Sequence, residues 1–288
     1  MSTSSIAKTE AIALRIAPFS NTSHVVTWLT PTHGRIATVI KGACRPKSPV
    51  FGQYDLGYLC ELLFYERDHN GIHIVKECST IDSRGHCRGN WQLTAAIGYL
   101  CHLASVATPD GAHAPDVYHL LEGTLNRVAD RGTPGDRDTE PPPAVPLSPT
   151  LPAPSAPSDL SPLLFWFELQ LLELLGIPPQ LQRCTACHQS SLPSLTTFSA
   201  RSGGAVCTAC VSKGRTSANT PLPGDALAML RRWQTAPTFE VLTTIAWTRP
   251  QQQQIRSLLG AFLIHHLDLA PECRSVAYSM LDTVTDSG

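Results

Sequence analysis

The first 80 residues alternate short apolar runs with turn residues. Runs rich in Val, Ile, Leu and Tyr occupy 11–17, 23–29, 34–41, 57–65 and 72–78. Proline, glycine, asparagine and aspartate separate them, and these residues favour turns. Each run is too short for a typical helix, so we expect five strands. Five strands with no helix between them favour a small closed barrel of the OB type, because closure removes exposed strand edges.

After residue 82 the apolar positions recur every three or four residues. This spacing predicts helices over 91–107, 116–128, 163–175, 224–233 and 251–269, with a further short helix at 239–246. We expect the third helix to begin near Ser161-Pro162 and to end at Gly176, since proline suits a first helical turn and glycine commonly follows a helix end.

The change of period divides the chain into two expected domains. We expect an OB-fold nucleic-acid-binding domain at 1–82 and a helical domain at 83–288. Residues 131–158 interrupt the second domain with nine prolines and almost no large apolar side chains. Such a segment packs no core, so we expect an extended insertion. The predicted fold class is α+β, a five-stranded OB-type barrel followed by a helical domain.

Two cysteine pairs, Cys184-Thr-Ala-Cys187 and Cys207-Thr-Ala-Cys210, are separated by 19 residues. This spacing is typical of a zinc site with four thiolate ligands. A closed four-cysteine shell leaves no position for water, so the expected Zn²⁺ is structural, in a module at 184–210 of the helical domain. The alternatives are two disulfides or four reduced cysteines, and His188 is a competing ligand candidate.

The net charge of the chain indicates no particular partner, but the sequence does indicate where in the cell the protein is expected. The chain of 288 residues has a net charge of −1. No apolar run reaches the roughly 18 residues that span a membrane, and the first residues lack the pattern of a signal peptide. We therefore expect a cytoplasmic protein. Thiols stay reduced there, which favours metal over disulfides at the paired cysteines.

Residues 11–54 contain no aspartate or glutamate but five basic side chains, Arg15, Arg35, Lys41, Arg45 and Lys47. A charge run is often an ordinary solvated face, but 44 residues without an acid indicate an anionic partner. The last three cations lie together with Ser48 after a predicted strand. Such a loop can present cations and a hydroxyl to phosphates, although it is not a Walker loop.

Other side chains give weaker signals. Barrel aromatics can stack on nucleic-acid bases, although aromatic residues in strands belong to the core more often. A group formed by Cys78, Asp82, His86 and Cys87 lacks the spacing of a metal site. No G-x-S-x-G or H-E-x-x-H pattern occurs, so we expect no enzyme. The stacking candidates are Trp28, Phe51, Tyr54 and Tyr58.

The order of these motifs resembles the RecO family of recombinational repair proteins. The resemblance covers nearly the whole chain except the proline-rich insertion, and the order of the motifs carries it more than any one of them. The matching segments are Leu29-Thr30, His33-Gly34, Lys41-Gly-Ala-Cys-Arg45-Pro-Lys47-Ser48, the helix ending at Leu175-Gly176 before Cys184, Phe198 to Cys210, and His265-His266-Leu267 with Arg274-Ser275.

The resemblance implies an OB-fold domain, a helical domain and a zinc module. It also implies binding to single- and double-stranded DNA, annealing of complementary strands, and partnership with RecR. The family helps to load RecA onto DNA coated by single-stranded-DNA-binding protein, without nucleotide hydrolysis, which would associate this chain with the nucleoid. By motif match, phosphate contacts fall on Arg35, Lys41, Arg45, Lys47 and Ser48.

Two other functions compete with this interpretation. One is an unrelated zinc-ribbon factor that binds nucleic acid, and the other is a zinc-stabilised nucleic-acid-modifying enzyme. Strand annealing without nucleotide turnover separates the family function from the enzyme. Binding to RecR separates it from the generic factor.

Overall fold

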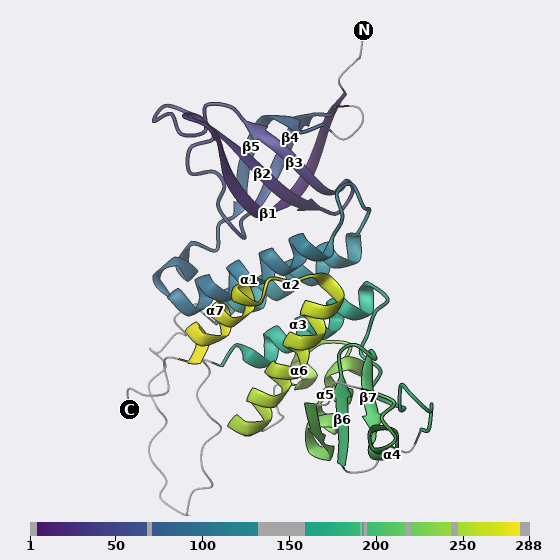
Figure 1. Cartoon of the computed structure of the whole chain (residues 1–288). Helices are drawn as coiled ribbons and strands as arrows, with labels where there is room; N and C mark the ends of the chain where they lie inside the picture. Colours follow the sequence, from purple (N-terminus) through teal and green to yellow (C-terminus); the bar gives the residue numbers. More distant parts are fainter. Residues whose placement is uncertain are drawn as a thin grey trace, which may run out of the picture.

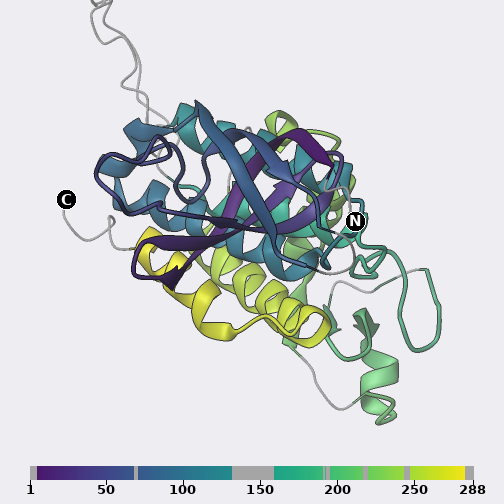
Figure 2. The same cartoon turned by 90° about the horizontal axis from the view of Figure 1, so that it is seen from above.

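The computed structural model describes residues 5–67, 71–131, 159–190, 192, 195–216, 220–242 and 247–282. The predicted insertion at 131–158 lies outside the described residues from position 132 onward. The N-terminal barrel rests on a layer formed by α1 (Trp91–Ala107) and α2 (Pro115–Asp130), with the remaining helices and a small sheet on the far side of that layer (Figure 1). Seen from above, the barrel covers part of the helical layer, and the end of the small sheet with its short helix projects beyond it (Figure 2).

Five strands form a closed barrel in the order β1-β2-β3-β5-β4, which confirms the predicted OB-type fold. The barrel closes where β4 pairs with β1, and β3 and β5 form the parallel pair. The first strand starts at Ile6, earlier than predicted, because its backbone continues to pair with β4 as far as Tyr65. The strands are β1 (Ile6–Ser20), β2 (Ser23–Thr30), β3 (Gly34–Ile40), β4 (Leu59–Tyr65) and β5 (His73–Asp82).

The centre of the barrel is filled by the indole of Trp28, which is fully buried. Its Nε1 donates a hydrogen bond of 2.8 Å to the hydroxyl of Thr38, so burial leaves no unpaired donor. At the lower end of the barrel, Leu14, Leu29 and Leu59 belong to the same apolar cluster as the side chains of α1. The barrel and the helices therefore share a packed boundary.

The helical part is built around α3 (Ser161–Leu174), which is buried on nearly every side. Apolar residues all round a helix are typical of a core position. The predicted helices at 91–107, 116–128, 163–175, 224–233 and 251–269 are all present. The sequence did not predict α7, and the helix predicted at 239–246 is a 3-10 turn, beyond which 243–246 lie outside the described residues. The other elements are η1 (Gly85–Gly89), α5 (Gly224–Thr235), η2 (Phe239–Leu242), α6 (Arg249–Leu267) and α7 (Pro271–Asp282).

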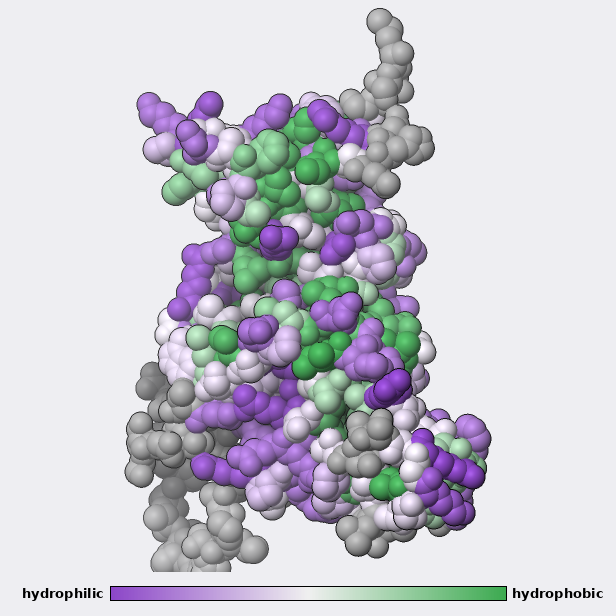
Figure 3. Space-filling view, viewed as in Figure 1, coloured by the Kyte–Doolittle hydropathy of each residue, from purple (hydrophilic) through white to green (hydrophobic). Residues whose placement is uncertain are grey.

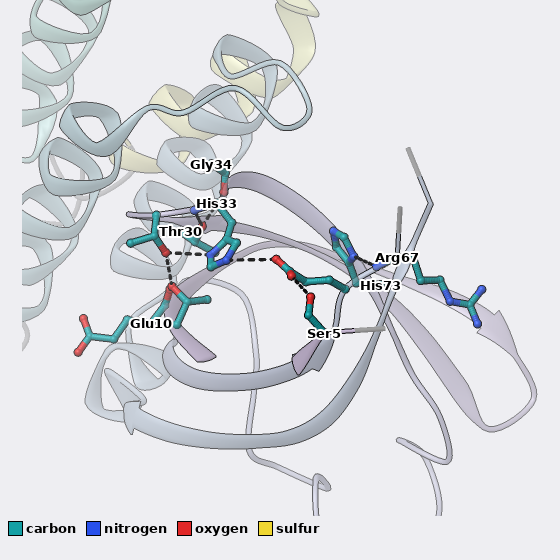
Figure 4. A network of polar contacts seen from close by, with 10 residues as sticks. Ser5, Glu10, Thr30, His33, Gly34, Arg67 and His73 are labelled. Carbon is teal, nitrogen blue, oxygen red and sulfur yellow. Dashed lines mark hydrogen bonds and ion pairs between the residues drawn. The ribbon is translucent and has the colours of Figure 1, made fainter. Parts of the chain in front are cut away.

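Polar contacts hold the β2–β3 turn in shape (Figure 4). The hydroxyl of Thr30 donates to the carbonyl of Gly34 at 2.9 Å and accepts from the backbone N–H of His33 at 2.9 Å. The imidazole of His33 lies 3.5 Å from Glu66, whose carboxylate also accepts a hydrogen bond from Ser5. His33 is therefore a turn residue, and it connects this turn to the residue after β4 and to the residue before β1.

The same turn docks on the helices through Gly34. Its φ of +66° lies in the left-handed region, and a Cβ there would be 1.9 Å from the carbonyl oxygen of Ala112, in the connection between α1 and α2. Gly52 has a similar φ of +75°, but a Cβ there would meet nothing within 4 Å. Alanine substitutions at these two glycines therefore distinguish the effect of backbone strain from the effect of a steric collision.

We expect Gly34→Ala to lower the free energy of unfolding by about 2 kcal/mol more than Gly52→Ala, because both variants strain the backbone but only the first collides with the helices. Urea unfolding of both proteins measures the difference. Equal losses in the two variants would contradict the steric role that we assign to Gly34.

Candidate nucleic-acid loop and metal centre

The connection between β3 and β4 carries most of the predicted DNA-binding residues. We call residues 41–48 the cationic loop. Lys41, Arg45 and Lys47 are exposed there, and Ser48 is half-buried. The backbone N–H of Arg45 donates to the carbonyl of Gly42 at 3.1 Å, and that of Ser48 donates to the carbonyl of Arg45 at 2.9 Å. These successive turns present the cations without fixing their side chains.

The cationic loop lies beside the β1–β2 turn, because the backbone N–H of Cys44 donates to the carbonyl of Thr22 at 3.2 Å. This end of the barrel lies away from the chain's N-terminus (Figure 1), and its surface shows hydrophilic side chains beside apolar ones (Figure 3). Among the described residues, no carboxylate forms an ion pair with Lys41, Arg45 or Lys47. Their charges are therefore available to an external anion.

Arg35, the remaining predicted phosphate contact, is placed differently. Its guanidinium donates to the carbonyl of Ser105 at 2.6 Å and pairs with Asp110 at 2.9 Å. Its own carbonyl accepts from the backbone N–H of Gly111 at 2.9 Å. Arg35 therefore joins the start of β3 to α1 and to the connection after it. It holds the barrel on the helices instead of facing solvent with the cationic loop.

The four stacking candidates differ in their exposure to solvent. Trp28 and Tyr58 are buried in the barrel, so neither offers a free ring face. The hydroxyl of Tyr54 lies 2.8 Å from the imidazole of His24, and burial raises the pKa of Tyr54. Phe51 is 61 % exposed in the same connection as the cationic loop. Sequence reasoning missed Phe19, 60 % exposed just before the β1–β2 turn, although an aromatic residue beside turn residues was a usable signal.

The four predicted metal ligands converge. The sulfurs of Cys184, Cys187, Cys207 and Cys210 lie within 4.8 Å of one another. The sulfurs of Cys187 and Cys207 are 3.8 Å apart. A tetrahedral site with metal–sulfur bonds of about 2.3 Å has edges of about 3.8 Å, whereas a disulfide needs about 2.05 Å. The geometry therefore fits a metal ion and excludes disulfides in this arrangement.

The electrostatics of the cluster also favour a cation. Burial acts to raise the pKa of Cys184, but backbone N–H groups of Cys207, Cys187 and Ala186 outweigh it and lower the pKa to about 6. Burial and the neighbouring thiols raise the pKa of Cys210 to about 12. The thiolate of Cys184 thus opposes ionisation of Cys210, and four thiolates at this distance require a positive ion among them.

The scaffold of the cluster is a small sheet that the sequence did not predict. Its strands are β6 (Leu195–Ser199), β7 (Gly204–Cys207) and β8 (Thr220–Pro223), in the order β7-β6-β8. The second cysteine pair spans the end of β7 and the start of α4 (Thr208–Ser212). A Cβ on Gly204 would be 2.2 Å from the carbonyl oxygen of Gln180, so glycine lets the two cysteine-bearing segments approach.

Comparison with protein families decides what this combination of barrel, helices and cysteine cluster is. Two family models, described as "Recombination protein O N terminal" and "Recombination protein O C terminal", match residues 1–84 and 150–273. The chain belongs to the RecO family. The two matches together span more than half of the chain, and they follow one another in the order expected from the motifs.

Curated members of the RecO family align with most of this chain. A protein of Dehalococcoides mccartyi strain 195 is 28% identical over 224 residues, which are 78% of this chain and 76% of the relative. A protein of Roseiflexus sp. RS-1 is 29% identical over 271 residues, 94% of this chain and 84% of the relative. A third, from Prosthecochloris aestuarii, is 22% identical over 277 residues, 94% and 95% of the two chains. Each is named DNA repair protein RecO.

Membership of the RecO family removes the unrelated zinc-ribbon factor from consideration. In the part of the chain that the structure describes, the four cysteines are the only group of three or more His, Cys, Asp or Glu residues with the geometry to hold a metal. His188 and the group of Cys78, Asp82, His86 and Cys87 are not part of such a site. The described helices also include none that is long and apolar enough to cross a membrane.

Proposed function

We propose that this chain is a DNA-binding recombination mediator that acts in DNA repair. It binds single- and double-stranded DNA, anneals complementary strands, and works with RecR to load RecA onto DNA coated by single-stranded-DNA-binding protein. Membership of the RecO family and the names of its relatives support the repair role. The observation that carries the DNA-binding part is the exposed cationic loop on an OB-type barrel, with no carboxylate partner for its cations among the residues that the structure describes.

In this proposal Lys41, Arg45 and Lys47 bind phosphates, with Ser48 as a hydrogen-bond donor. Phosphate contacts position a strand without reading its bases, so binding is independent of sequence and weakens with salt. Phe51 supplies a ring on which a base stacks. Cations that neutralise both strands reduce their mutual repulsion, which favours annealing. Arg35 acts indirectly, because it holds the barrel on the helices.

The remaining assignments follow from the same picture. Residues 1–82 form the nucleic-acid-binding domain, and residues 83–288 form the helical domain. The cluster at 184–210 holds Zn²⁺ as a structural ion, because soft thiolates in a tetrahedral arrangement suit zinc and leave no open position. The chain is not an enzyme. We place it in the cytoplasm, at the nucleoid, where its proposed DNA substrate lies.

An annealing assay with two complementary fluorescent oligonucleotides tests this function. We expect the protein to accelerate pairing equally with and without nucleotide triphosphate. We also expect the accelerated pairing to become slower as salt is raised. Annealing no faster than the protein-free reaction, or a strict requirement for nucleotide hydrolysis, would contradict the proposal.

We expect the double variant Lys41→Ala with Arg45→Ala to weaken DNA binding and to reduce the slope of log affinity against log salt by about 2, one unit for each lost phosphate contact. Fluorescence anisotropy with double-stranded DNA at several salt concentrations measures both quantities. The matched control is Lys8→Ala with Lys76→Ala, which removes the same charge from exposed barrel positions that lie beside Glu61 and Glu77. If both double variants change the slope equally, the cationic loop has no special part in binding.

A further inference from the structure

One thiol in the cationic loop lies against an imidazole. Cys44 is exposed, and its Sγ is 3.3 Å from Nε2 of His24. The other ring nitrogen of His24 is 2.8 Å from the hydroxyl of Tyr54. Tyr54 in turn packs beside Trp28, with ring centroids 6.1 Å apart. A nucleophile, a base and a group that orients the base therefore lie in series, as in activated cysteines.

The loop around Cys44 is also electropositive. Lys41, Arg45 and Lys47 lie on the same loop within three residues of it. The nearest acid along the chain, Asp55, is paired with Arg88 at 2.7 Å. Reactive cysteines lie in partly exposed, electropositive surroundings of this kind, because cations and an imidazole stabilise the anionic sulfur.

The other described cysteines lack this arrangement. Four of them form the metal centre, and Cys60, Cys78, Cys87 and Cys101 are buried in apolar surroundings. Cys273, on α7, is half-buried, and no described histidine hydrogen-bonds to it. Cys273 is therefore an internal reference for an ordinary thiol of the same chain.

We propose that Cys44 is an oxidant-sensitive modification site, and that its modification turns off DNA binding by the cationic loop. The consequence for DNA rests on the proposed function, whereas the reactivity of the thiol does not. The oxidant is a hydroperoxide, and the second reactant is an anionic low-molecular-weight thiol such as glutathione. Cys44 occupies a position where bulk and negative charge would directly oppose phosphate binding.

The chemistry runs in two steps. His24 accepts the proton of Cys44, and the thiolate attacks the peroxide, so that a sulfur–oxygen bond forms and the oxygen–oxygen bond breaks. The departing oxygen takes the proton, which gives a sulfenic acid and water or an alcohol; sulfur loses two electrons and peroxide gains them. The small thiol then displaces the hydroxyl of the sulfenic acid, which forms a mixed disulfide and releases water. Excess reductant reverses the modification.

Alkylation rates test the reactivity. The full-length, metal-loaded protein is treated with iodoacetamide at neutral pH, and each cysteine is followed by peptide mass spectrometry. We expect Cys44 to react about 10-fold faster than Cys273, because Cys44 is exposed beside an imidazole and three cations, whereas Cys273 is half-buried. His24→Gln should remove this excess. Tyr54→Phe keeps the packed ring but removes the orienting hydroxyl, and should reduce the excess even if His24→Gln fails to fold. Equal rates at Cys44 and Cys273, or an unchanged excess in a folded His24 or Tyr54 variant, would overturn the proposed activation.

DNA binding tests the consequence. Protein treated with hydrogen peroxide and glutathione should bind single-stranded DNA about 10-fold more weakly, consistent with the loss of one or two phosphate contacts, and dithiothreitol should restore affinity. Cys44→Ser treated in the same way should keep its affinity. Complete modification of Cys44 without loss of affinity would overturn the regulatory role. Failure of the untreated protein to bind DNA would instead count against the proposed function, and the alkylation rates would still decide the chemistry of Cys44.

Discussion

Arg274→Met should lower the free energy of unfolding by about 3–5 kcal/mol, because it leaves the carboxylate of Glu168 buried without its cation. Glu168, in the middle of α3, is fully buried. Its two oxygens accept hydrogen bonds of 2.9 Å from Nε and a terminal nitrogen of Arg274. The hydroxyls of Tyr99 and Tyr278 donate to the same carboxylate at 2.6 and 3.1 Å. The network therefore joins α1, α3 and α7 at one point.

The matched control for this prediction is Asp282→Asn. It breaks the ion pair between Arg256 and Asp282, which joins α6 and α7 at the surface, and it should cost less than about 1 kcal/mol. Guanidinium unfolding of both variants provides the comparison. A second variant, Glu168→Leu with Arg274→Met, should recover part of the loss, since it removes both charges together. If Arg274→Met is no more destabilising than the surface control, the buried pair does not stabilise the helical part.

Removing the metal should unfold the cysteine-rich module while the barrel stays folded. Structural zinc contributes about 10–16 kcal/mol of binding free energy in zinc-finger peptides. Among the described residues, the separate buried cluster around the cysteines adds only Val206 to the cysteines themselves. We expect Cys184→Ser to reduce bound zinc from one ion per chain to nearly none. Fast hydrogen exchange should then appear over β6, β7 and β8, with the barrel strands still protected. Elemental analysis and hydrogen-exchange mass spectrometry measure both effects.

Cys273→Ser is the control for the metal prediction, since Cys273 lies outside the cluster and should keep both zinc and protection. Full zinc content or an intact module in Cys184→Ser would contradict the assignment.

The barrel and the cysteine cluster could be predicted because their signals are local. Turn residues delimit each apolar run of the barrel, and paired cysteines carry their own spacing. The sheet that carries the cluster was missed for a local reason as well. Its strands have only four or five residues, and β8 contains two prolines, which place it at the edge of a sheet and weaken any strand pattern.

The missed interactions are those between distant residues. Arg274 looks like a surface residue in sequence, and its partner Glu168 lies 106 positions earlier. The buried Arg274 also interrupts the apolar period of α7. Similarly, Arg35 belongs to the acid-free segment, but it hydrogen-bonds to Ser105, 70 positions later. Composition predicts that a residue is basic, whereas only the fold determines whether that charge faces solvent or a neighbouring element.

The third strand connects two parts of the molecule that have been described separately. It begins at Gly34 and Arg35, which dock on the helices, and it ends at Ile40, immediately before the cationic loop. Seven extended residues span roughly 20 Å. The strand therefore acts as a rigid spacer of fixed length. A DNA strand held by the loop would be kept at a set distance from the α1–α2 connection, and a pull on that DNA would be transmitted along β3 to the Gly34 contact.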